Sequence, residues 1–513
     1  PRSTPLYSSA ASDVYKRQPM LLPNASFQAF LFLGTSCISA LGANQLHVAP
    51  PPLGSDSNPG TLSHPFATIA HAELQTQAGD TVFLHEGVYR ESVRFRRSGT
   101  PHAPITYRPY DGGQTLAKVS LSTFKVIEPG VSGAGIWEQH RDSIFKIQLS
   151  QEYGLGVGKS SILIDGKAQK IARWPNAPKA FDFNWENMAA AQQAFHDPFS
   201  AGPEPPYEGT FFTASYHDLA LPDREVDSWR GARIDTSPGG GVFRDTGVVT
   251  GSGANSLTFR YRPFRKPGAY VARADPYFLW NHLNALDEEG EYFFDIEGVS
   301  GPAYTLYLFP PGGRSPDQHT IEIKSREYAF DLNWTSHVHL KQLSFIGGGI
   351  QCPVSSSSIL MDDLHVRYGG SGLDGLQPGR AAIWLKGNGH TLLNSQIEES
   401  YGGGVITLGT FTEIRNNVIR DCMLYGIASF DSSDIHVHQN TIYGNQGENI
   451  HMYSPRGRFN YNHCYHAGRR VTDSASLNSN YNGDLQGMEA VSYTHLRAHE
   501  TGRNLVCRRL LEK

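Results

Sequence analysis

The stretch of sequence that decides the fold is IRNNVIRDCMLYGIASFDSSDIHVHQNTIYGNQGENIHMYSPRGRFNYNHC, residues 414–464. Within it one pattern recurs: an apolar residue, an asparagine three positions later and an apolar residue five positions later. The copies are Ile414/Asn417/Ile419, Val437/Asn440/Ile442 and Phe459/Asn462/Cys464. A repeat of this period is typical of stacked β coils, in which each coil buries its apolar side chains against its neighbours.

The pattern continues toward the N-terminus when any polar residue is accepted at its middle position. The further copies are Val338/Lys341/Leu343, Ile359/Asp362/Leu364 and Leu392/Ser395/Ile397. The first positions of the six copies follow one another at 21, 33, 22, 23 and 22 residues, so one coil carries about 11 extra residues. A second strand in each coil is anchored by Ile350, Ile383, Val405, Ile427 and Ile450.

These observations predict an all-β protein with a right-handed parallel β-helix. We expect Ile414, Val437 and Phe459 to lie in one interior column, because equivalent residues of successive coils stack. Asn417, Asn440 and Asn462 are expected to form a ladder of hydrogen-bonded asparagines. The leucine spacing of leucine-rich repeats is absent.

The composition agrees with a turn-rich β protein. The chain has 513 residues, with 53 Gly, 31 Pro and 18% charged residues, so glycine is above and charge below the usual share. The net charge is −5 and no segment is strongly basic, which argues against a nucleic-acid partner. Composition leaves the oligomeric state open.

The two ends of the chain differ from the rest. Residues 1–19 and 491–513 resemble translated sequencing-adapter read-through and are set apart from the fold. Residues 20–43 form an apolar run that ends in small residues, which indicates a signal peptide; a buried element of the first domain is the alternative. Polar interruptions make the run too weak for a membrane span. We therefore expect a secreted, periplasmic or cell-surface protein.

Residues 44–115 are expected to form the N-terminal cap and first coils. They contain GSDSNPG at 54–60, PFATI at 65–69, AGDTVFL at 78–84 and GVYRE at 87–91, the order of turn, short helix and strands. The helix would cover the open end of the stack, which otherwise exposes its core and strand edges. This segment resembles the cap of the pectate-lyase-like β-helix superfamily, closest in motif order to glycoside hydrolase families 141 and 120. The resemblance covers about residues 45–488 and implies a carbohydrate-active protein, although lyases, hydrolases and epimerases share the cap.

The middle of the chain breaks the coil rhythm. Residues 116–330 alternate apolar and polar positions with frequent Gly and Pro, which predicts an inserted antiparallel β module. Residues 331–490 then carry the β-helix coils. An insertion of this kind also occurs in the family 141-like group that the chain resembles.

Chemistry on a β-helix must use outward side chains and corner loops, because the interior is apolar. One outward column, six residues after each first position, is predicted to contain Ser344, His365, Glu398, Arg420, Tyr443 and Tyr465. Glu398 and Arg420 are candidate substrate-binding residues; a surface ion pair is the alternative. Glu399 and Asp421 follow them one coil apart and are candidate catalytic carboxylates, because a glycosidase requires two.

The segment from 422 to 458 is richest in functional residue types. Asp431 follows a predicted strand, and Glu448 lies one coil later. The segment resembles the catalytic coil of family 120, which implies that Asp431 is the first catalytic acid, displaced by one residue. The second acid would then fall near Tyr453, so Glu448, Glu399 or Asp421 is left as the partner of Asp431.

Further substrate-binding candidates lie on the same coils. They are His451, Tyr453, Arg456 and Trp384, and Trp384 is an outward aromatic residue suited to stacking on a sugar. A loop around residues 371–375 is expected to wall a cleft beside Trp384.

No cofactor is predicted. A Ca²⁺ ion held by carboxylates such as Asp362, Asp363, Asp431 or Asp434 is left open, because pectate lyases of this fold use one. His436 and His438 share a strand face without an evident third ligand, so we predict no metal site of the Zn²⁺ type.

The function predicted from these residues is a glycoside hydrolase that cleaves a polysaccharide or oligosaccharide with two carboxylates. The first alternative is a polysaccharide lyase, in which Arg or Lys neutralises a uronate and a base removes the adjacent proton; Arg420, Arg456, Arg458 and the pair His436 and His438 support it. The second alternative is a protein that binds glycans without cleaving them.

Overall fold

The computed structural model describes one compact unit that begins at Ala43. The described residues are 43–112, 118–131, 133–180, 182–204, 207–222, 225–238, 244–263, 270–372, 381–469, 476–478, 487–491 and 494–495. The expected signal peptide up to residue 42, the tip of the loop around 371–375 and most of 491–513 lie outside them. No helix among the described residues is long and apolar enough to cross a membrane.

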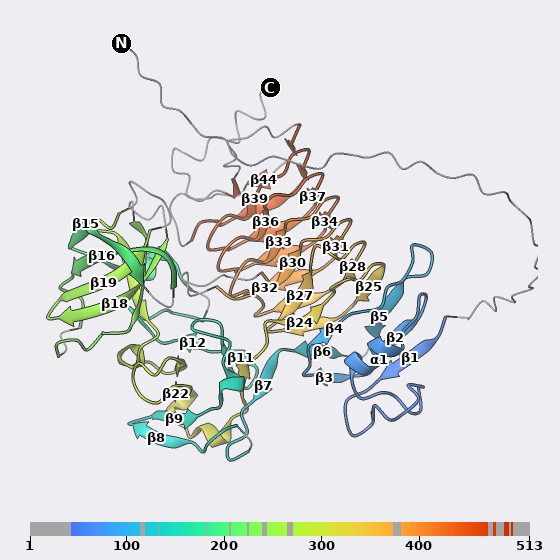
Figure 1. Cartoon of the computed structure of the whole chain (residues 1–513), viewed down its shortest axis with the longest axis horizontal. Helices are drawn as coiled ribbons and strands as arrows, with labels where there is room; N and C mark the ends of the chain where they lie inside the picture. Colours follow the sequence, from blue (N-terminus) through green and yellow to red (C-terminus); the bar gives the residue numbers. More distant parts are fainter. Residues whose placement is uncertain are drawn as a thin grey trace, which may run out of the picture. The chain divides into compact units, whose positions relative to one another are not determined.

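Three long parallel sheets build the body of this unit (Figure 1). The first sheet contains, in spatial order, β1 Gln45–Val48, β2 Thr81–Leu84, β5 Ile105–Pro109, β25 Val338–Lys341, β28 Leu360–Asp362, β31 Thr391–Leu393, β34 Glu413–Arg415, β37 His436–His438, β40 Arg458–Asn460 and β43 Glu489–Val491. The second contains β3 Gly87–Tyr89, β6 Val119–Ser122, β26 Ser344–Ile346, β29 His365–Arg367, β32 Gln396–Glu398, β35 Val418–Arg420, β38 Thr441–Tyr443, β41 His463–Tyr465 and β44 Thr494–His495. The third contains β4 Val93–Arg94, β24 Tyr328–Asp331, β27 Gly349–Cys352, β30 Ile383–Leu385, β33 Val405–Thr407, β36 Ile427–Ser429, β39 Ile450–His451 and β42 Leu477–Asn478. Because each coil adds one strand to each sheet, the predicted right-handed parallel β-helix is confirmed.

The interior of the helix is a set of apolar columns. Ile414 pairs with Val437 and Val437 with Phe459, and all three side chains are fully buried. Burying a side chain of this size contributes roughly 1.5–3 kcal/mol. Cys352 and Cys464 also lie in this core with fully buried side chains. The predicted interior column is therefore confirmed.

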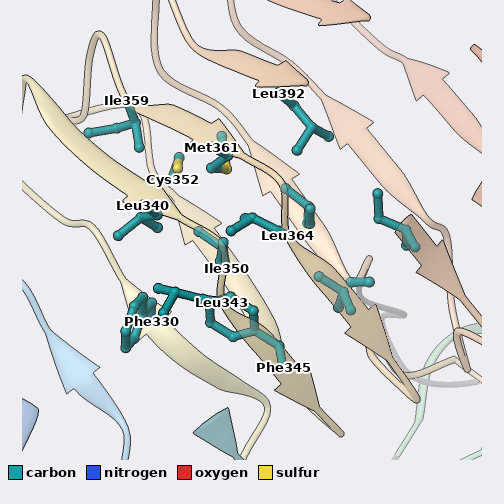
Figure 2. Close-up of a cluster of buried hydrophobic side chains, with 14 of the residues drawn as sticks. Phe330, Leu340, Leu343, Phe345, Ile350, Cys352, Ile359, Met361, Leu364 and Leu392 are labelled. Carbon is teal, nitrogen blue, oxygen red and sulfur yellow. The ribbon is translucent and has the colours of Figure 1, made fainter. Parts of the chain in front are cut away.

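The same column continues toward the N-terminus with a different register from the one expected. Figure 2 shows Leu340, Met361 and Leu392 in the core, and the pairing runs Leu340 to Met361 to Leu392. The sequence pattern had placed Val338 and Ile359 in these positions, two residues too early. A slip of two residues keeps the same side chains facing inward, so the apolar pattern cannot detect it.

A ladder of polar side chains runs along the corner between the first and second sheets. The Oγ of Ser395 accepts from Leu364 N at 3.0 Å. The Oδ1 of Asn417 accepts from Ser395 N at 2.9 Å, that of Asn440 from Asn417 N at 3.0 Å and that of Asn462 from Asn440 N at 3.1 Å. Buried backbone N–H groups that the corner would leave without partners are thereby satisfied. The predicted asparagine ladder is present.

A short helix covers the N-terminal end of the stack. The helix α1 runs from Ile69 to Gln75 and is capped by Thr68, whose side chain accepts from His71 N. Glu91 accepts hydrogen bonds from the N–H groups of Ile69 and Ala70. A carboxylate is stabilised there because the first N–H groups of a helix have no partner within the helix.

The inserted module lies between β6 and β24. One sheet contains β11 Lys167–Ala168, β10 Ile162–Ile164, β23 Ile321–Lys324 and β7 Phe124–Val126, and a second β12 Lys170–Ile171, β21 Glu291–Asp295, β22 Thr305–Phe309, β9 Ile144–Gln148 and β8 Glu138–Arg141. The largest contains β13 Arg173–Trp174, β20 Pro276–Trp280, β17 Arg233–Thr236, β18 Asp245–Gly253, β19 Ser256–Arg262, β16 Tyr207–His217 and β15 Gln193–Glu204, with β14 Ala189–Ala190 on β20. Short 3₁₀ helices are η1 Gln151–Tyr153, η2 Trp185–Asn187, η3 Leu283–Ala285, η4 Pro311–Gly313 and η5 Pro316–Gln318. The strand pairs are antiparallel except β12 with β21.

The module packs against the corner between the second and third sheets. Its side chains Phe183, Phe278 and Trp280 share one apolar cluster with Tyr401 and Met423 of the coils.

The boundaries of the module differ from the expected ones. β6 and most of β24 lie within residues 116–330, which were expected to form the module, but both are strands of the coils. β43 and β44 reach residue 495, so coil strands extend past residue 490.

The ladder predicts a measurable loss of stability in Asn440→Ala. The Asn440 side chain accepts from Asn417 N and donates to Ile414 O and to Asn462 Oδ1 within the core. Alanine would leave these buried groups without partners, and we expect the free energy of unfolding to fall by about 2–4 kcal/mol in urea titrations. The matched control is Asn388→Ala, which removes an exposed ladder contact to Thr410 and should cost less than about 1 kcal/mol. Equal losses in the two variants would contradict the structural role of the buried ladder.

Candidate functional site

Glu398 is the centre of an ion-pair network on the second sheet. Its Oε1 lies 2.9 Å from His365 Nε2 and 3.1 Å from Arg367 Nε, and its Oε2 is paired with Arg420. The Glu398 side chain is only 11% exposed. A carboxylate with both oxygens committed to cations has little capacity left for substrate. Glu398 thus holds three basic side chains in place, and its role and that of Arg420 in substrate binding stay predictions.

The register of this column differs from the expected one. In the strand register, Glu398 stands opposite Arg367 rather than His365, and opposite Arg420 on the other side. The column continues with Tyr443 and Tyr465, whose rings stack at 4.6 Å. The two-residue slip in the core column explains why Arg367 was missed.

Glu399 and Asp421 occupy equivalent corners on adjacent coils. Both have φ of 54°, and their N–H groups donate to Arg420 O and Tyr443 O at 3.1 and 3.2 Å. Arg367 Nη2 lies 2.9 Å from Glu399 Oε2, and Arg420 Nη1 lies 2.6 Å from Asp421 Oδ2. The structure thus brings these two predicted carboxylates onto adjacent coils, whose strands lie about 4.8 Å apart. Glu399 forms an ion pair with Arg367, and Asp421 with Arg420.

The third sheet carries an aromatic surface. Trp384 and His451 lie in one outward column, joined by Ile406 and Ala428. The His451 ring lies 5.2 Å from the ring of Tyr425 and 5.1 Å from that of Phe430. We call Trp384, Tyr425, Phe430 and His451 the aromatic face. Tyr425 and Phe430 had not been predicted as site residues, because each becomes a neighbour of His451 only through coil stacking.

Glu448 borders the aromatic face. It follows the loop that starts at Gly444, and its carbonyl accepts from Gly426 N at 3.0 Å. Its side chain is 13% exposed. Oε1 accepts a hydrogen bond from Asn478 Nδ2 at 2.8 Å and lies 3.9 Å from His451 Nδ1, which is too long for a hydrogen bond. Burial raises the pKa of Glu448, but these polar neighbours outweigh burial and lower it below its ordinary value. Glu448 is therefore an ionised carboxylate in a half-buried, aromatic setting.

Asp421 reaches toward the same corner loop. A Cβ atom added to Gly444 would lie 2.9 Å from Asp421 Oδ1, so the carboxylate covers this glycine. From Gly444 to Glu448 the chain spans four residues, at most about 14 Å when extended and less around a corner. Asp421 and Glu448 thus lie at the two ends of one corner loop.

Asp431 lies elsewhere on the third sheet. It is exposed, follows β36 and has φ of 47°. Ile427 pairs with Ile450, so Asp431 stands four positions after this pair and Glu448 two positions before it. Asp431 and Glu448 thus flank this strand pair from opposite ends, six register positions apart, and their pairing as catalytic carboxylates stays a prediction.

Tyr453 and Arg456 lie progressively further along the same coil. Tyr453 N donates a hydrogen bond to Ser429 Oγ at 2.8 Å. Tyr453 therefore lies beside the last residue of β36. Arg456 forms two 2.6 Å bonds to Asp434 and is half exposed. Arg456 and Asp434 line a hollow of about 380 Å³ at the edge of the first sheet, so Arg456 is not part of the aromatic face.

The candidate metal ligands are arranged differently from the sequence-based expectation. Asp362, one of the proposed Ca²⁺ ligands, accepts from Asn394 Nδ2 at 2.8 Å. Among the described residues, Glu413, His436 and His438 each offer one possible metal-ligand atom, and these three atoms lie within 4.8 Å of one another. The expectation that the two histidines lack a third ligand was wrong, because Glu413 is supplied by the preceding coil.

Comparison with known proteins agrees with the fold. The family model "Right handed beta helix region" matches residues 349–487. The uncharacterised protein YwoF of Bacillus subtilis is 37% identical over 101 residues, which are 18% of this chain and 21% of that protein. Pectate lyase PEL9 of Emericella nidulans is 36% identical over 79 residues, 15% of this chain and 19% of that protein. The matches thus span about a fifth of the length of these curated relatives.

A solved structure described as a glycoside hydrolase superposes with a TM-score of 0.62 at 15% identity, covering 85% of each chain. Together the sheets, the cap and these similarities define a right-handed parallel β-helix protein. In fold the chain is similar to pectate-lyase-like β-helix proteins, and residues 349–487 match the right-handed β-helix family model.

The Glu398 network predicts a stability loss in Glu398→Gln. The substitution keeps the shape but removes the charge that Arg367 and Arg420 share, and these arginines are 39% and 32% exposed. Partial screening by water limits the expected loss to about 1–2 kcal/mol in urea titrations. Asp434→Asn, which breaks the exposed pair with Arg456, is the control and should cost at most about 1 kcal/mol. An unchanged Glu398→Gln variant would show that the network does not stabilise the fold.

Proposed function

We propose that the protein is a glycoside hydrolase that acts on a polysaccharide or oligosaccharide outside the cell, with Glu448 and Asp421 as its two carboxylates. The observation that carries the proposal is the ionised, half-buried Glu448 at the edge of the aromatic face. Aromatic rings bind the apolar faces of sugars, and a carboxylate beside them faces the glycosidic bond. The pectate lyase named among the relatives supports a polysaccharide as the substrate class.

Glu448 is assigned the role of base or nucleophile, because its lowered pKa keeps it ionised. Asp421 is assigned the role of the second carboxylate. Its Oδ2 lies 2.6 Å from Arg420 Nη1, and Arg420 is shared with Glu398.

The lyase alternative is less well supported. A lyase needs a free cation to neutralise the uronate carboxylate. Arg367 and Arg420 are both committed to protein carboxylates, and Arg456 lies away from the aromatic face. Lys386 Nζ, which lies 4.6 Å from the centroid of the Trp384 ring, is the cation at the aromatic face on which a lyase reaction would depend.

A screen on neutral and uronate-containing polysaccharides tests the proposal. Two signals are followed: new reducing ends, and the near-ultraviolet absorbance of the unsaturated product that a lyase forms. We expect reducing ends without this absorbance. Absorbance would replace the hydrolase by a lyase, and binding without either signal would replace it by a glycan-binding protein.

Glu448→Gln tests the carboxylate assignment. Loss of the ionised group should lower kcat by about 10²–10⁴-fold on the substrate that the screen identifies. In the unaltered protein the acidic limb of the pH profile should lie below the ordinary glutamate pKa of 4.5, because the pKa of Glu448 is lowered. Glu489→Gln, which changes an exposed glutamate 3.9 Å from Arg458, should leave kcat unchanged. Full turnover in Glu448→Gln would refute the assignment.

Trp384→Ala tests the aromatic face as a sugar platform. Loss of one stacking contact, worth about 0.5–1.5 kcal/mol, should raise KM by up to about tenfold while kcat changes less. Trp384→Phe should recover most of the affinity. Trp334→Ala, at a tryptophan that is 76% exposed, serves as the control for a surface ring outside the face. Identical KM values for all variants would exclude Trp384 from the binding surface.

A further inference from the structure

Two histidines and a glutamate meet on the outer face of the first sheet. His436 and His438 both lie on β37, and Glu413 lies on the neighbouring β34, directly paired with His436. One ligand atom from each side chain falls within 4.8 Å of the other two. These residues lie on a different sheet from the aromatic face, so the inference does not rest on the proposed hydrolase function.

The β-helix itself produces this arrangement. Residues i and i+2 of a strand point to the same side, about 6.6 Å apart, and the adjacent strand runs about 4.8 Å away. The rings of His436 and His438 lie parallel with centroids 3.9 Å apart. His438 Nε2 lies 3.2 Å from Glu413 Oε1. Three ligating side chains from two adjacent strands therefore face one point in solvent.

We propose that Glu413, His436 and His438 form a binding site for a divalent transition-metal ion of the Zn²⁺ type. Two imidazoles and one carboxylate are a ligand set that Zn²⁺ and its neighbours in the first row accept, whereas Ca²⁺ prefers oxygen alone.

The distances need little adjustment for metal binding. With bonds of about 2.1 Å, ligand atoms around a tetrahedral metal lie about 3.4 Å apart. The contact between His438 and Glu413, 3.2 Å, already has this spacing. The widest separation within the group, at most 4.8 Å, closes by side-chain rotation, since all three residues are half-buried rather than locked in the core.

Two arginines are the main competitors for the metal. Arg415 Nε lies 3.3 Å from Glu413 Oε1, and Arg458 pairs in register with His436. Their side chains are 38% and 66% exposed, so both can turn into solvent and their charges are screened by salt. On the open side, His436 and Arg458 line the hollow of about 380 Å³. Water or an anionic ligand can reach a fourth coordination position from this hollow.

Metal titration of the full chain tests the site. The protein is stripped with a chelator, dialysed and titrated with Zn²⁺ by calorimetry and with Co²⁺ by visible absorption, which reports the coordination geometry. We expect one equivalent to bind, with the Co²⁺ spectrum of a four-coordinate site. Glu413→Gln, His436→Asn and His438→Asn should each weaken binding at least tenfold.

The matched control is His339→Asn. His339 lies on β25 of the same sheet, three strands from β34, so its loss should leave the affinity unchanged. Circular dichroism of each variant separates loss of a ligand from loss of the fold. Absence of binding to the unaltered protein, or binding that the three ligand variants leave unchanged, would overturn the proposal.

Discussion

The structure depends on the stacking of equivalent residues from one coil to the next. A single coil contributes strands of two to five residues and cannot bury its own apolar side chains. Ile414, Val437 and Phe459 are fully buried because each covers the one before it. Parallel hydrogen bonds between coils then satisfy the backbone, and the Asn417–Asn440–Asn462 ladder does the same at a corner where the strands end. Stability is thus a sum of nearest-neighbour contacts.

The same stacking creates the chemistry of the surface. Residues separated by one coil come within about 4.8 Å of one another, so charges and rings far apart in the chain become direct neighbours. Glu398 meets Arg420 in this way, and Glu413 meets His436. Corner residues with positive φ, such as Glu399 and Asp421, turn their carboxylates out of the sheet at a regular spacing.

The two proposed sites use different faces of this scaffold. The hydrolase site combines the third-sheet aromatic face with the corner where the inserted module packs, through Tyr401 and Met423, against the coils. The metal site lies on the first sheet and needs no part of the module. Because each face repeats along the helix axis, separate sites can be built on one rigid core without altering it.

The apolar repeat by itself determined the fold, the interior column, the asparagine ladder and the approximate place of the inserted module. These features depend on local periodicity, which is written directly in the chain. The sequence also identified Glu398, Glu399, Arg420 and Asp421 as neighbours, since between residues 392 and 464 the coil lengths were counted correctly.

Only the tertiary structure decided the register across the longer coil and the contacts that depend on it. A shift of two residues preserves the inward-facing pattern, so periodicity could not distinguish His365 from Arg367 as the register neighbour of Glu398. Nor could it show that Glu413 completes a group with two histidines, or that Asp431 and Glu448 stand at opposite ends of one sheet. These relations depend on how far each corner loop carries the chain before the next strand begins, and the apolar pattern does not encode that length.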